Sequence, residues 1–310
     1  MDKHLLTEME IRDFKCFKDF KAEGFKRVNL IGGKNNVGKT AFMEACYVNI
    51  YASKSSDNNS MALSDIVFTR YNQVILQDLL LEKGKLYISK EIEKKIIQFD
   101  KATFISNITT TKCKYTEGDL GIRDKSNTIK YFLGNNQITN DKLEESYGCI
   151  IELEMEKEID KLIKNIDSNI KSFRIINSKP KCNFINDNKF YDLHELGDGV
   201  YKYISILLSL FICKNSYLFI DEIDNGIHYM NQDKLWEIIL NVSKEQNVQV
   251  FATTHSKECI ESYARVAKKL EDEDISFIEL GRNDDKLESI TYSYDEVINQ
   301  IAKYQDMRGW

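Results

Sequence analysis

The sequence predicts an α/β fold with a mainly parallel sheet, because short apolar strands alternate with helices along its C-terminal half. The alternating segments are a helix over 200–213, a strand over 217–220, a helix over 232–242, a strand over 248–252 and a helix over 257–270. Near the N-terminus, a strand over 27–31 runs into a glycine-rich turn, and a buried helix follows over 40–51. Both regions indicate strands that are joined through helices, which is how parallel strands are connected.

The 310 residues, of which 42% are hydrophobic, can bury a large core, and we expect one elaborated domain. Residues 1–52, β-rich at the start, and 186–310 are predicted to form its core, with an inserted mixed lobe over 53–185. The lobe begins with the polar stretch SKSSDNNSMALS and continues into the strand-like runs LYISKEIEKKIIQF and TIKYFLG. A charged amphipathic helix is predicted over 152–170.

Composition excludes several classes of protein. The 43 basic and 49 acidic residues give a net charge of −6, which argues against a protein coated in positive charge for nucleic acid, although a local basic groove stays open. The seven scattered cysteines contain no C-x-x-C pair, so we expect reduced thiols and neither a disulfide framework nor a zinc site. No run approaches the ~18 apolar residues of a membrane span, and no signal-peptide cleavage site is evident. We therefore expect a cytoplasmic protein.

The turn GKNNVGKT over residues 33–40 fits G-x-x-x-x-G-K-[ST], in which backbone N–H groups fold around phosphate oxygens. We expect Lys39 to reach the β- and γ-phosphates of ATP, and the Thr40 hydroxyl to ligate Mg²⁺. The alternative is a glycine turn beside a surface lysine, which the placement between strand and helix disfavours. The predicted nucleotide-binding residues here are Gly33, Lys34, Asn35, Asn36, Val37, Gly38, Lys39, Thr40 and Ala41.

An apolar strand ends in two carboxylates at Asp221 and Glu222, an arrangement that is costly unless a cation or a proton transfer compensates it. Asp221 suits the Mg²⁺ shell, and Glu222 suits the general base that polarises the attacking water. An ordinary strand end is the alternative for this motif alone. Its pairing with a phosphate loop favours the catalytic interpretation.

A histidine, His255, follows the strand over 248–252, at the edge where open α/β sheets collect ligands. We expect it to donate a hydrogen bond to the γ-phosphate. The alternative is that Thr254 or Ser256 caps the next helix and His255 is a bystander. The two interpretations are compatible.

Two glycines, Gly197 and Gly199, flank Asp198 just before the helix over 200–213. Glycines at a helix N-terminus make an anion site. A nucleotide that is already bound by residues 33–40 does not need this second anion site. The alternative is an N-cap by Asp198 with flanking glycine turns.

Together these motifs resemble the ABC-type P-loop ATPases, in particular the transporter-independent branch of SMC-like and OLD-like proteins and small bacterial AAA-family ATP-binding proteins. MEIRDFKCFKDF…RVNLIGGKNNVGKT resembles the first strand and Walker A of that branch, and LGDG resembles its signature motif. LFIDEIDNGIH resembles Walker B with the D-loop, and VFATTHS resembles the switch-histidine strand. The resemblance covers about residues 5–50 and 190–310.

The resemblance implies an ABC-ATPase-like fold and a homodimer that sandwiches ATP. It implies that Gly197 and Gly199 contact the γ-phosphate held by a second subunit, with residues 224–228 at the dimer interface. Asp198 replaces the usual serine of the signature, so slow hydrolysis is expected. Gln73 and Gln77 are the candidates for the Q-loop glutamine.

The function that the resemblance implies is a regulatory or sensor ATPase that acts on a separate effector, in a setting such as bacterial anti-phage defence. An SMC-like nucleic-acid maintenance ATPase and an ATP-dependent scaffold that does not hydrolyse are the alternatives. An OLD-like nuclease is disfavoured because too few residues follow His255 for a domain of ~100 residues or more. A transporter motor is disfavoured by the signature, and the acidic cluster over 271–274 is expected to face solvent.

Overall fold

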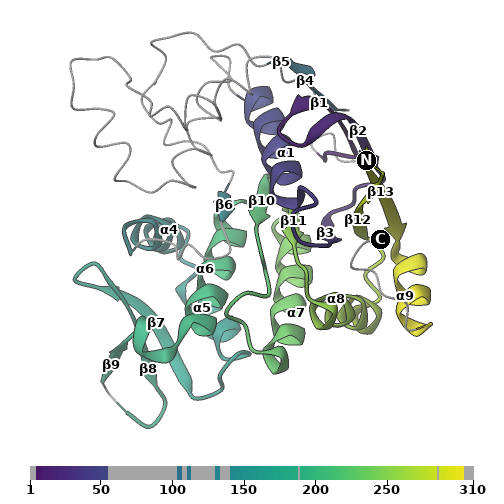
Figure 1. The fold of residues 1–310 in the computed structure, drawn as a ribbon. Helices are drawn as coiled ribbons and strands as arrows, with labels where there is room; N and C mark the ends of the chain where they lie inside the picture. The colour runs from purple at the N-terminus through teal and green to yellow at the C-terminus, as the bar shows by residue number, and fades with distance from the viewer. Residues whose placement is uncertain are drawn as a thin grey trace, which may run out of the picture.

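A six-stranded sheet with the order β13-β12-β3-β11-β10-β6 forms the centre of the molecule (Figure 1). The computed structural model describes residues 5–54, 103–106, 110–112, 130–132, 140–187, 189–284 and 286–303. All neighbouring strands of this sheet pair in parallel except β12 and β13, so the predicted α/β class with a mainly parallel sheet is confirmed. Its strands are β3 (Val28–Gly33), β6 (Lys130–Phe132), β10 (Tyr217–Ile220), β11 (Gln249–Thr253), β12 (Ile275–Asn283) and β13 (Lys286–Ser293).

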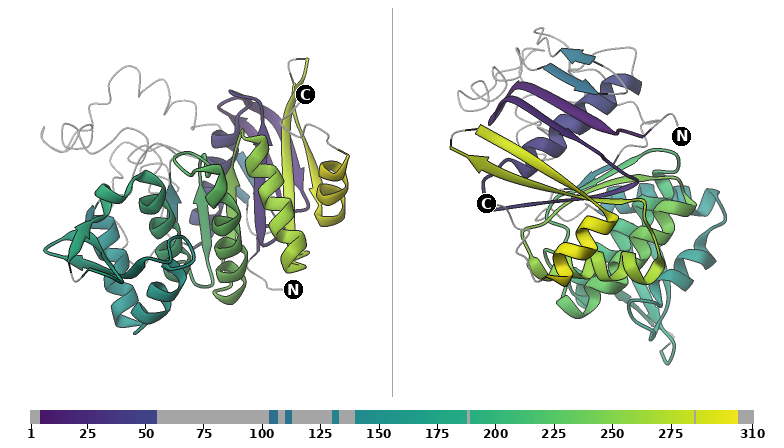
Figure 2. Two further views of the ribbon diagram at one scale, coloured as in Figure 1. Left: turned by 90° about the horizontal axis from the view of Figure 1, so that it is seen from below. Right: turned by 90° about the vertical axis from the view of Figure 1, so that its right-hand side faces the viewer.

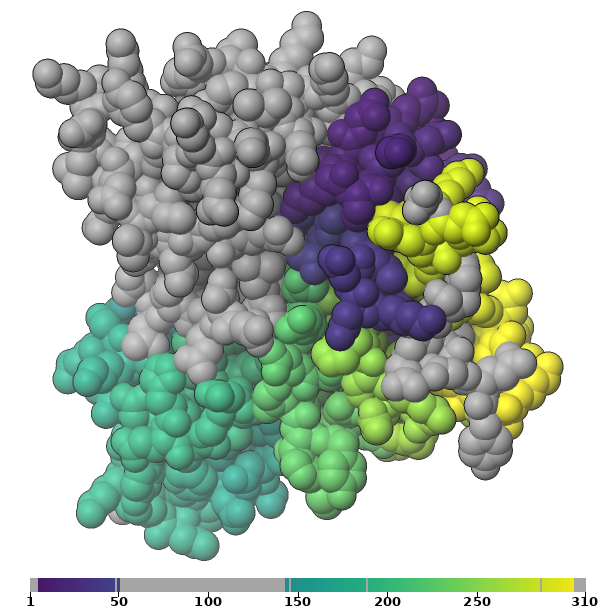
Figure 3. All heavy atoms as spheres, viewed as in Figure 1, coloured from purple at the N-terminus to yellow at the C-terminus, as the bar shows by residue number. Residues whose placement is uncertain are grey.

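An antiparallel sheet with the order β2-β1-β4-β5 lies over one face of α1 (Lys39–Lys54), and the central sheet lies on the other side of that helix (Figure 2). The β12–β13 hairpin adjoins the N-terminal strands at the surface (Figure 3), where Ser289 Oγ donates to the carbonyl of Lys21 at 2.9 Å. The N-terminal part is therefore β-rich, as predicted. The strands of the antiparallel sheet are β1 (Glu8–Phe14), β2 (Phe17–Glu23), β4 (Thr103–Ser106) and β5 (Thr110–Lys112).

The central strands divide their side chains between two hydrophobic cores. On β10, Phe219 joins the core around α1 and the N-terminal sheet, whereas Leu218 and Ile220 join the core on the opposite face. On β11, Phe251 and Val250 divide in the same way. Because successive side chains of a strand point to opposite faces, a fully apolar strand indicates a sheet covered on both sides.

Helices cover the second face of the sheet (Figure 2). Three of them match the predicted helical segments closely, because apolar side chains recur on the face that packs against the sheet. No helix in the described parts of the chain is long and apolar enough to cross a bilayer. The helices on this second face are α6 (Asp198–Ile212), α7 (Tyr229–Glu245), α8 (Lys257–Leu270) and α9 (Tyr294–Ala302), of which α6, α7 and α8 correspond to predicted helices.

The predicted helix over 152–170 is confirmed only over residues 156–163 and is wrong for the rest. The chain leaves the helical conformation at Glu154, whose φ is 54°, and the next helix ends at Ile163. The Asp167 side chain then accepts a hydrogen bond from the N–H of Asn169, which makes a turn that leads into a strand. The elements here are α4 (Asn140–Glu152), α5 (Glu156–Ile163), β7 (Ile170–Ile176), β8 (Lys179–Phe184), β9 (Phe190–Asp192) and the short helix η1 (Leu193–Leu196).

The proposed division into a core and a lobe over 53–185 stays a prediction, because most of residues 55–139 lie outside the described part of the chain. Within that segment, β4 pairs with β1 and β6 pairs with β10, so these strands extend sheets of the predicted core. The run LYISKEIEKKIIQF and the candidates Gln73 and Gln77 also lie outside the described residues. The six described cysteines form no disulfide with one another.

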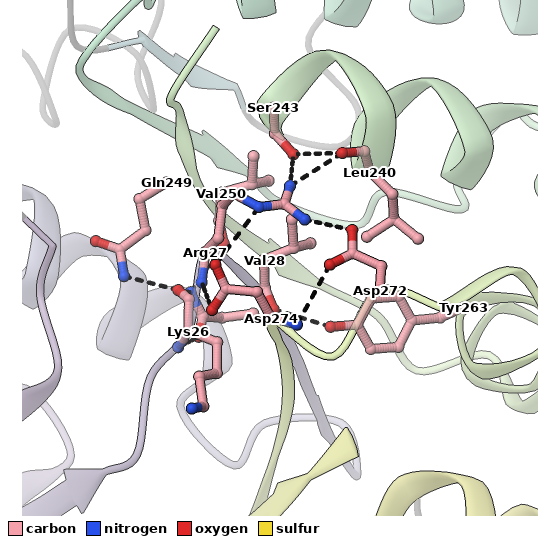
Figure 4. A network of polar contacts seen from close by, with 11 residues as sticks. Lys26, Arg27, Val28, Leu240, Ser243, Gln249, Val250, Tyr263, Asp272 and Asp274 are labelled. Atoms are coloured by element: carbon pink, nitrogen blue, oxygen red, sulfur yellow. Dashed lines mark hydrogen bonds and ion pairs between the residues drawn. The ribbon is translucent and has the colours of Figure 1, made fainter. Parts of the chain in front are cut away.

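The acidic cluster over 271–274 does not face solvent throughout, contrary to expectation. Asp272 is buried and pairs with the buried guanidinium of Arg27 (Figure 4). Arg27 also donates to the carbonyl of Leu240 at 3.0 Å and to the hydroxyl of Ser243. The network therefore joins the start of β3, α7 and the turn after α8, and a buried charge of this kind requires its partner.

We expect Arg27→Met to lower the free energy of unfolding by about 3 to 5 kcal/mol, because it leaves Asp272 buried without its cation. Denaturant unfolding would measure the difference. The matched control is Arg265→Met, whose partner Asp233 lies 2.6 Å away but whose side chain is 59% exposed. The control should cost about 1 kcal/mol or less. Equal losses in the two variants would contradict the structural role of the buried pair.

Candidate nucleotide site

The phosphate loop, residues 33–40, connects β3 to α1, so strand, glycine loop and helix follow in the predicted order. The turn between β1 and β2 closes over this loop. At Gly38, φ is 91° and a Cβ would lie 2.6 Å from Cys16 Sγ and 3.2 Å from the Phe17 ring. No other residue fits there, because both the backbone conformation and the space require glycine.

Lys39 lies at the first position of α1, and its Nζ donates to the carbonyls of Gly33 at 2.7 Å and Lys34 at 2.8 Å. Burial lowers the pKa of Lys39, and the nearby carboxylates of Asp221 and Glu222 act in the opposite direction. The ammonium group therefore lies between the phosphate loop and the acidic strand end. This is the place from which a lysine reaches the β- and γ-phosphates of a bound nucleotide.

Thr40 and Asp221 come together although they are 181 positions apart in the sequence. The Thr40 hydroxyl donates to Asp221 Oδ2 at 2.8 Å, and the Thr253 hydroxyl donates to Asp221 Oδ1 at 2.5 Å. A hydroxyl and one carboxylate fit Mg²⁺, which takes its remaining ligands from water and phosphate oxygens. The two residues that the sequence predicts as metal ligands therefore lie in direct contact, and the metal site itself stays a prediction.

Glu222 is the second residue after β10 and has a left-handed conformation with φ 49°. Its N–H donates to Thr253 Oγ1 at 2.8 Å, and the Asn225 Nδ2 lies 3.5 Å from its Oε2. The Glu222 carboxylate thus lies beside Asn225, whereas the carboxylate of Asp221 accepts from Thr40 and Thr253. A carboxylate beside a metal-bound nucleotide can act as general base.

The segment after β11 contains both a cap and an exposed histidine. Ser256 caps α8, since its hydroxyl accepts from the N–H of Cys259 at 3.1 Å, as one of the alternatives predicted. Thr254 instead donates to Asp224 Oδ1 at 2.6 Å. His255 lies between them and is exposed at the carboxyl edge of the sheet, where a bound phosphate could reach it.

The glycine motif over 197–199 lies at the N-terminus of α6. The alternative N-cap by Asp198 is wrong, because Asp198 is the first helical residue and Gly197 occupies the cap position without a side-chain hydrogen bond. A Cβ on Gly199 would lie 2.9 Å from the carbonyl of Gly226, whereas one on Gly197 would meet nothing within 4 Å. This end of α6 therefore packs against the loop after Glu222 on one side and is open on the other.

Comparisons with known proteins find similarity to ATPases. A family model described as an AAA ATPase domain matches residues 139–260. A Helicobacter pylori protein described as an ATP/GTP phosphatase is 24% identical to this chain over an alignment of 330 residues. The alignment covers 86% of this chain and 89% of that protein.

Two solved SMC head structures share the fold. One, bound to the C-winged helix domain of ScpA, has a TM-score of 0.53 and 11% identity over 95% of this chain and 99% of that chain. The other, derived from Pyrococcus furiosus and bound to the C-terminal domain of ScpA, has a TM-score of 0.52 and 11% identity, covering 96% and 99%. The chain is a P-loop ATPase that shares its fold with the SMC heads.

Two residues of this ATPase that sequence reasoning missed hold the site together. Thr253 contacts both Asp221 and Glu222, and a polar residue at the end of an apolar strand was its only signal. Lys202 lies within α6 and donates to the carbonyls of Glu222 at 2.5 Å and Asn225 at 3.0 Å. Burial lowers the pKa of Lys202 to about 8. Its signal was a lone cation in the otherwise apolar run VYKYISILL.

Proposed function

We propose that this ATPase works as a homodimer that sandwiches ATP and Mg²⁺ and passes its change of shape to a separate effector. In each subunit the phosphate loop binds one nucleotide, Lys39 contacts its β- and γ-phosphates, and Thr40 and Asp221 ligate Mg²⁺. Glu222 activates the attacking water, and His255 contacts the γ-phosphate. The hydrogen bond between Thr40 and Asp221 supports this assignment most directly, because it joins the two motifs that hold one metal ion.

The uncapped N-terminus of α6 supports the dimer. Its first N–H groups have no side-chain cap, and the space around Gly197 is open. The N-terminus of a helix carries a partial positive charge, and its N–H groups point toward a bound anion. We propose that it binds the γ-phosphate held by the partner subunit. Backbone N–H groups carry this contact, because Asp198 offers no hydroxyl donor.

The effector and the setting are the finer parts of the proposal. The two similar SMC heads were solved with ScpA domains bound, which supports a protein partner for an ATPase of this fold. The sequence resemblance supports a role of this cytoplasmic ATPase in bacterial anti-phage defence. A phage-challenge assay with the gene and its neighbours, in parental and Lys39→Ala form, tests this setting. Equal protection by the two forms would contradict it.

An SMC-like role in nucleic-acid maintenance is the second candidate, and the likeness to SMC heads favours it. The two functions differ in what should stimulate the enzyme. Phosphate release measured with and without double-stranded DNA separates them, because a maintenance ATPase should be faster with DNA. The sensor proposal expects stimulation by a partner protein instead.

The dimer is tested at the signature glycine. We expect Gly199→Glu to block dimerisation with ATP and Mg²⁺, because it adds a negative side chain where the partner's γ-phosphate should bind. Size-exclusion chromatography with light scattering, in a Glu222→Gln background that retains ATP, measures the oligomer. A nucleotide-free sample shows whether any dimer depends on ATP.

Two controls accompany this variant. Gly148→Glu places the same side chain on α4, where a Cβ meets nothing within 4 Å, and it should dimerise normally. Gly199→Ala adds only the Cβ that presses on Gly226, so it separates displacement of that loop from the effect of charge. If Gly199→Glu dimerises with ATP to the same extent as Gly148→Glu, the proposed ATP-sandwich dimer is contradicted.

A further inference from the structure

The backbone of Glu222 is held from two sides in an unfavourable conformation. Its φ of 49° lies in the left-handed region, which residues with a Cβ rarely adopt. Its N–H donates to Thr253 Oγ1 at 2.8 Å, and its carbonyl accepts from Lys202 Nζ at 2.5 Å. These two hydrogen bonds fix the peptide planes on both sides of the residue. Loss of either bond lets the backbone relax and turns the carboxylate.

Lys202 connects this backbone to α6. Its Nζ donates to the carbonyl of Asn225 at 3.0 Å as well, and the Asn225 amide lies 3.5 Å from the Glu222 carboxylate. One turn earlier in the same helix, Gly199 packs directly on the carbonyl of Gly226. The 222–226 loop is therefore attached to the N-terminal turn of α6 at two points, one polar and one steric.

We infer that Lys202 is a positioning residue that couples the nucleotide-facing end of α6 to the carboxylate of Glu222. The inference rests on the proposed role of Glu222 as general base. A phosphate bound at Gly197 and Gly199 fixes the start of α6, and the lysine carries that constraint to the backbone of the base. Hydrolysis in one site thus depends on the nucleotide of the partner subunit.

The test compares two half-buried lysines that each donate to backbone carbonyls. Lys202→Met keeps the aliphatic length but removes the donors, and we expect kcat to fall about 10- to 100-fold, since small misplacements of a catalytic group have effects of that size. KM for ATP should stay close to the parental value, because the phosphate loop is untouched. The matched control is Lys234→Met, which removes a half-buried lysine on α7 that donates to the carbonyl of Ile166 at 3.0 Å. Its kcat should be parental.

Two further variants separate positioning from a structural effect. Lys202→Arg retains the charge and the donors and should recover most of the lost kcat. Lys202→Met combined with Glu222→Gln should be no slower than Glu222→Gln alone in single-turnover assays, because the lysine acts through that carboxylate. Should Lys202→Met fail to fold, Lys202→Gln, which removes the charge but keeps a polar side chain, replaces it in each comparison.

The possible results discriminate between the inference and the function on which it rests. A parental kcat in Lys202→Met, equal kcat losses in the two Met variants, or a further loss in the double variant would each overturn the coupling. Turnover at the parental rate in the Glu222→Gln single variant would overturn the base assignment itself. The expected pattern is a stalled Glu222→Gln, a slow Lys202→Met and a normal Lys234→Met.

Discussion

Lys39→Ala is expected to lower the affinity for ATP by roughly 100-fold or more while the protein stays folded. The variant removes charge-assisted hydrogen bonds to two phosphates, each of which contributes about 1.5 to 3 kcal/mol. In the described part of the chain, Lys39 Nζ donates hydrogen bonds to the carbonyls of Gly33 and Lys34, which belong to the loop itself. Buried side chains other than Lys39 anchor α1, namely Phe42, Met43, Ala45 and Cys46.

Calorimetric titration with ATP and Mg²⁺ measures this change, and a thermal melt of the same sample checks the fold. Lys268→Ala, which changes an exposed lysine in the last turn of α8, is the control and should bind ATP like the parent. Unchanged ATP affinity in Lys39→Ala would show that the loop over 33–40 is not the nucleotide site.

Glu222→Gln is expected to retain ATP and to reduce turnover by about 100- to 10,000-fold, the range in which general bases contribute. The amide has the shape of the carboxylate but cannot accept a proton from water. The contacts that fix this residue use its backbone, namely those to Thr253 and Lys202, so they survive the substitution. Trapped ATP should then favour the dimer.

Phosphate release under saturating ATP measures the turnover, with nucleotide binding measured on the same sample. Glu245→Gln, an exposed glutamate at the end of α7, is the matched control and should turn over normally. Parental turnover in Glu222→Gln would assign the base to another residue, and the nearby Asp224 would be the first to examine.

Most of the sheet and its helices could be predicted from local patterns. The strand over 217–220 and the helix over 257–270 have the predicted bounds, because each is an apolar segment whose ends carry clear signals. Ser256 is such a signal, since a serine before an apolar helix satisfies its first N–H groups. The helix over 152–170 failed because periodicity alone does not reveal a turn. The first helical segment stops before Glu154, the second ends at Ile163, and the Asp167 side chain then makes the turn into β7.

The residues of the candidate site also fall into two groups, those that could be predicted from the sequence and those that could not. Asp221 and Glu222 could be found because carboxylates at the end of an apolar strand are costly and therefore conspicuous. Lys202 and Thr253 could not, because one lysine in a helix and one threonine in a strand are ordinary in sequence. Their contacts to Glu222 come from elements that only the folded sheet places side by side.

The sequence by itself determined the chemistry of this ATPase: a phosphate loop between a strand and a helix, and a strand that ends in two carboxylates. These motifs are local, so their geometry follows from neighbouring residues and hardly depends on the rest of the chain. Only the tertiary structure decided which distant groups meet, such as Thr40 with Asp221 and Arg27 with Asp272. Apolar periodicity specifies which face of an element is buried but not which element covers it, so partners across the fold are set by packing.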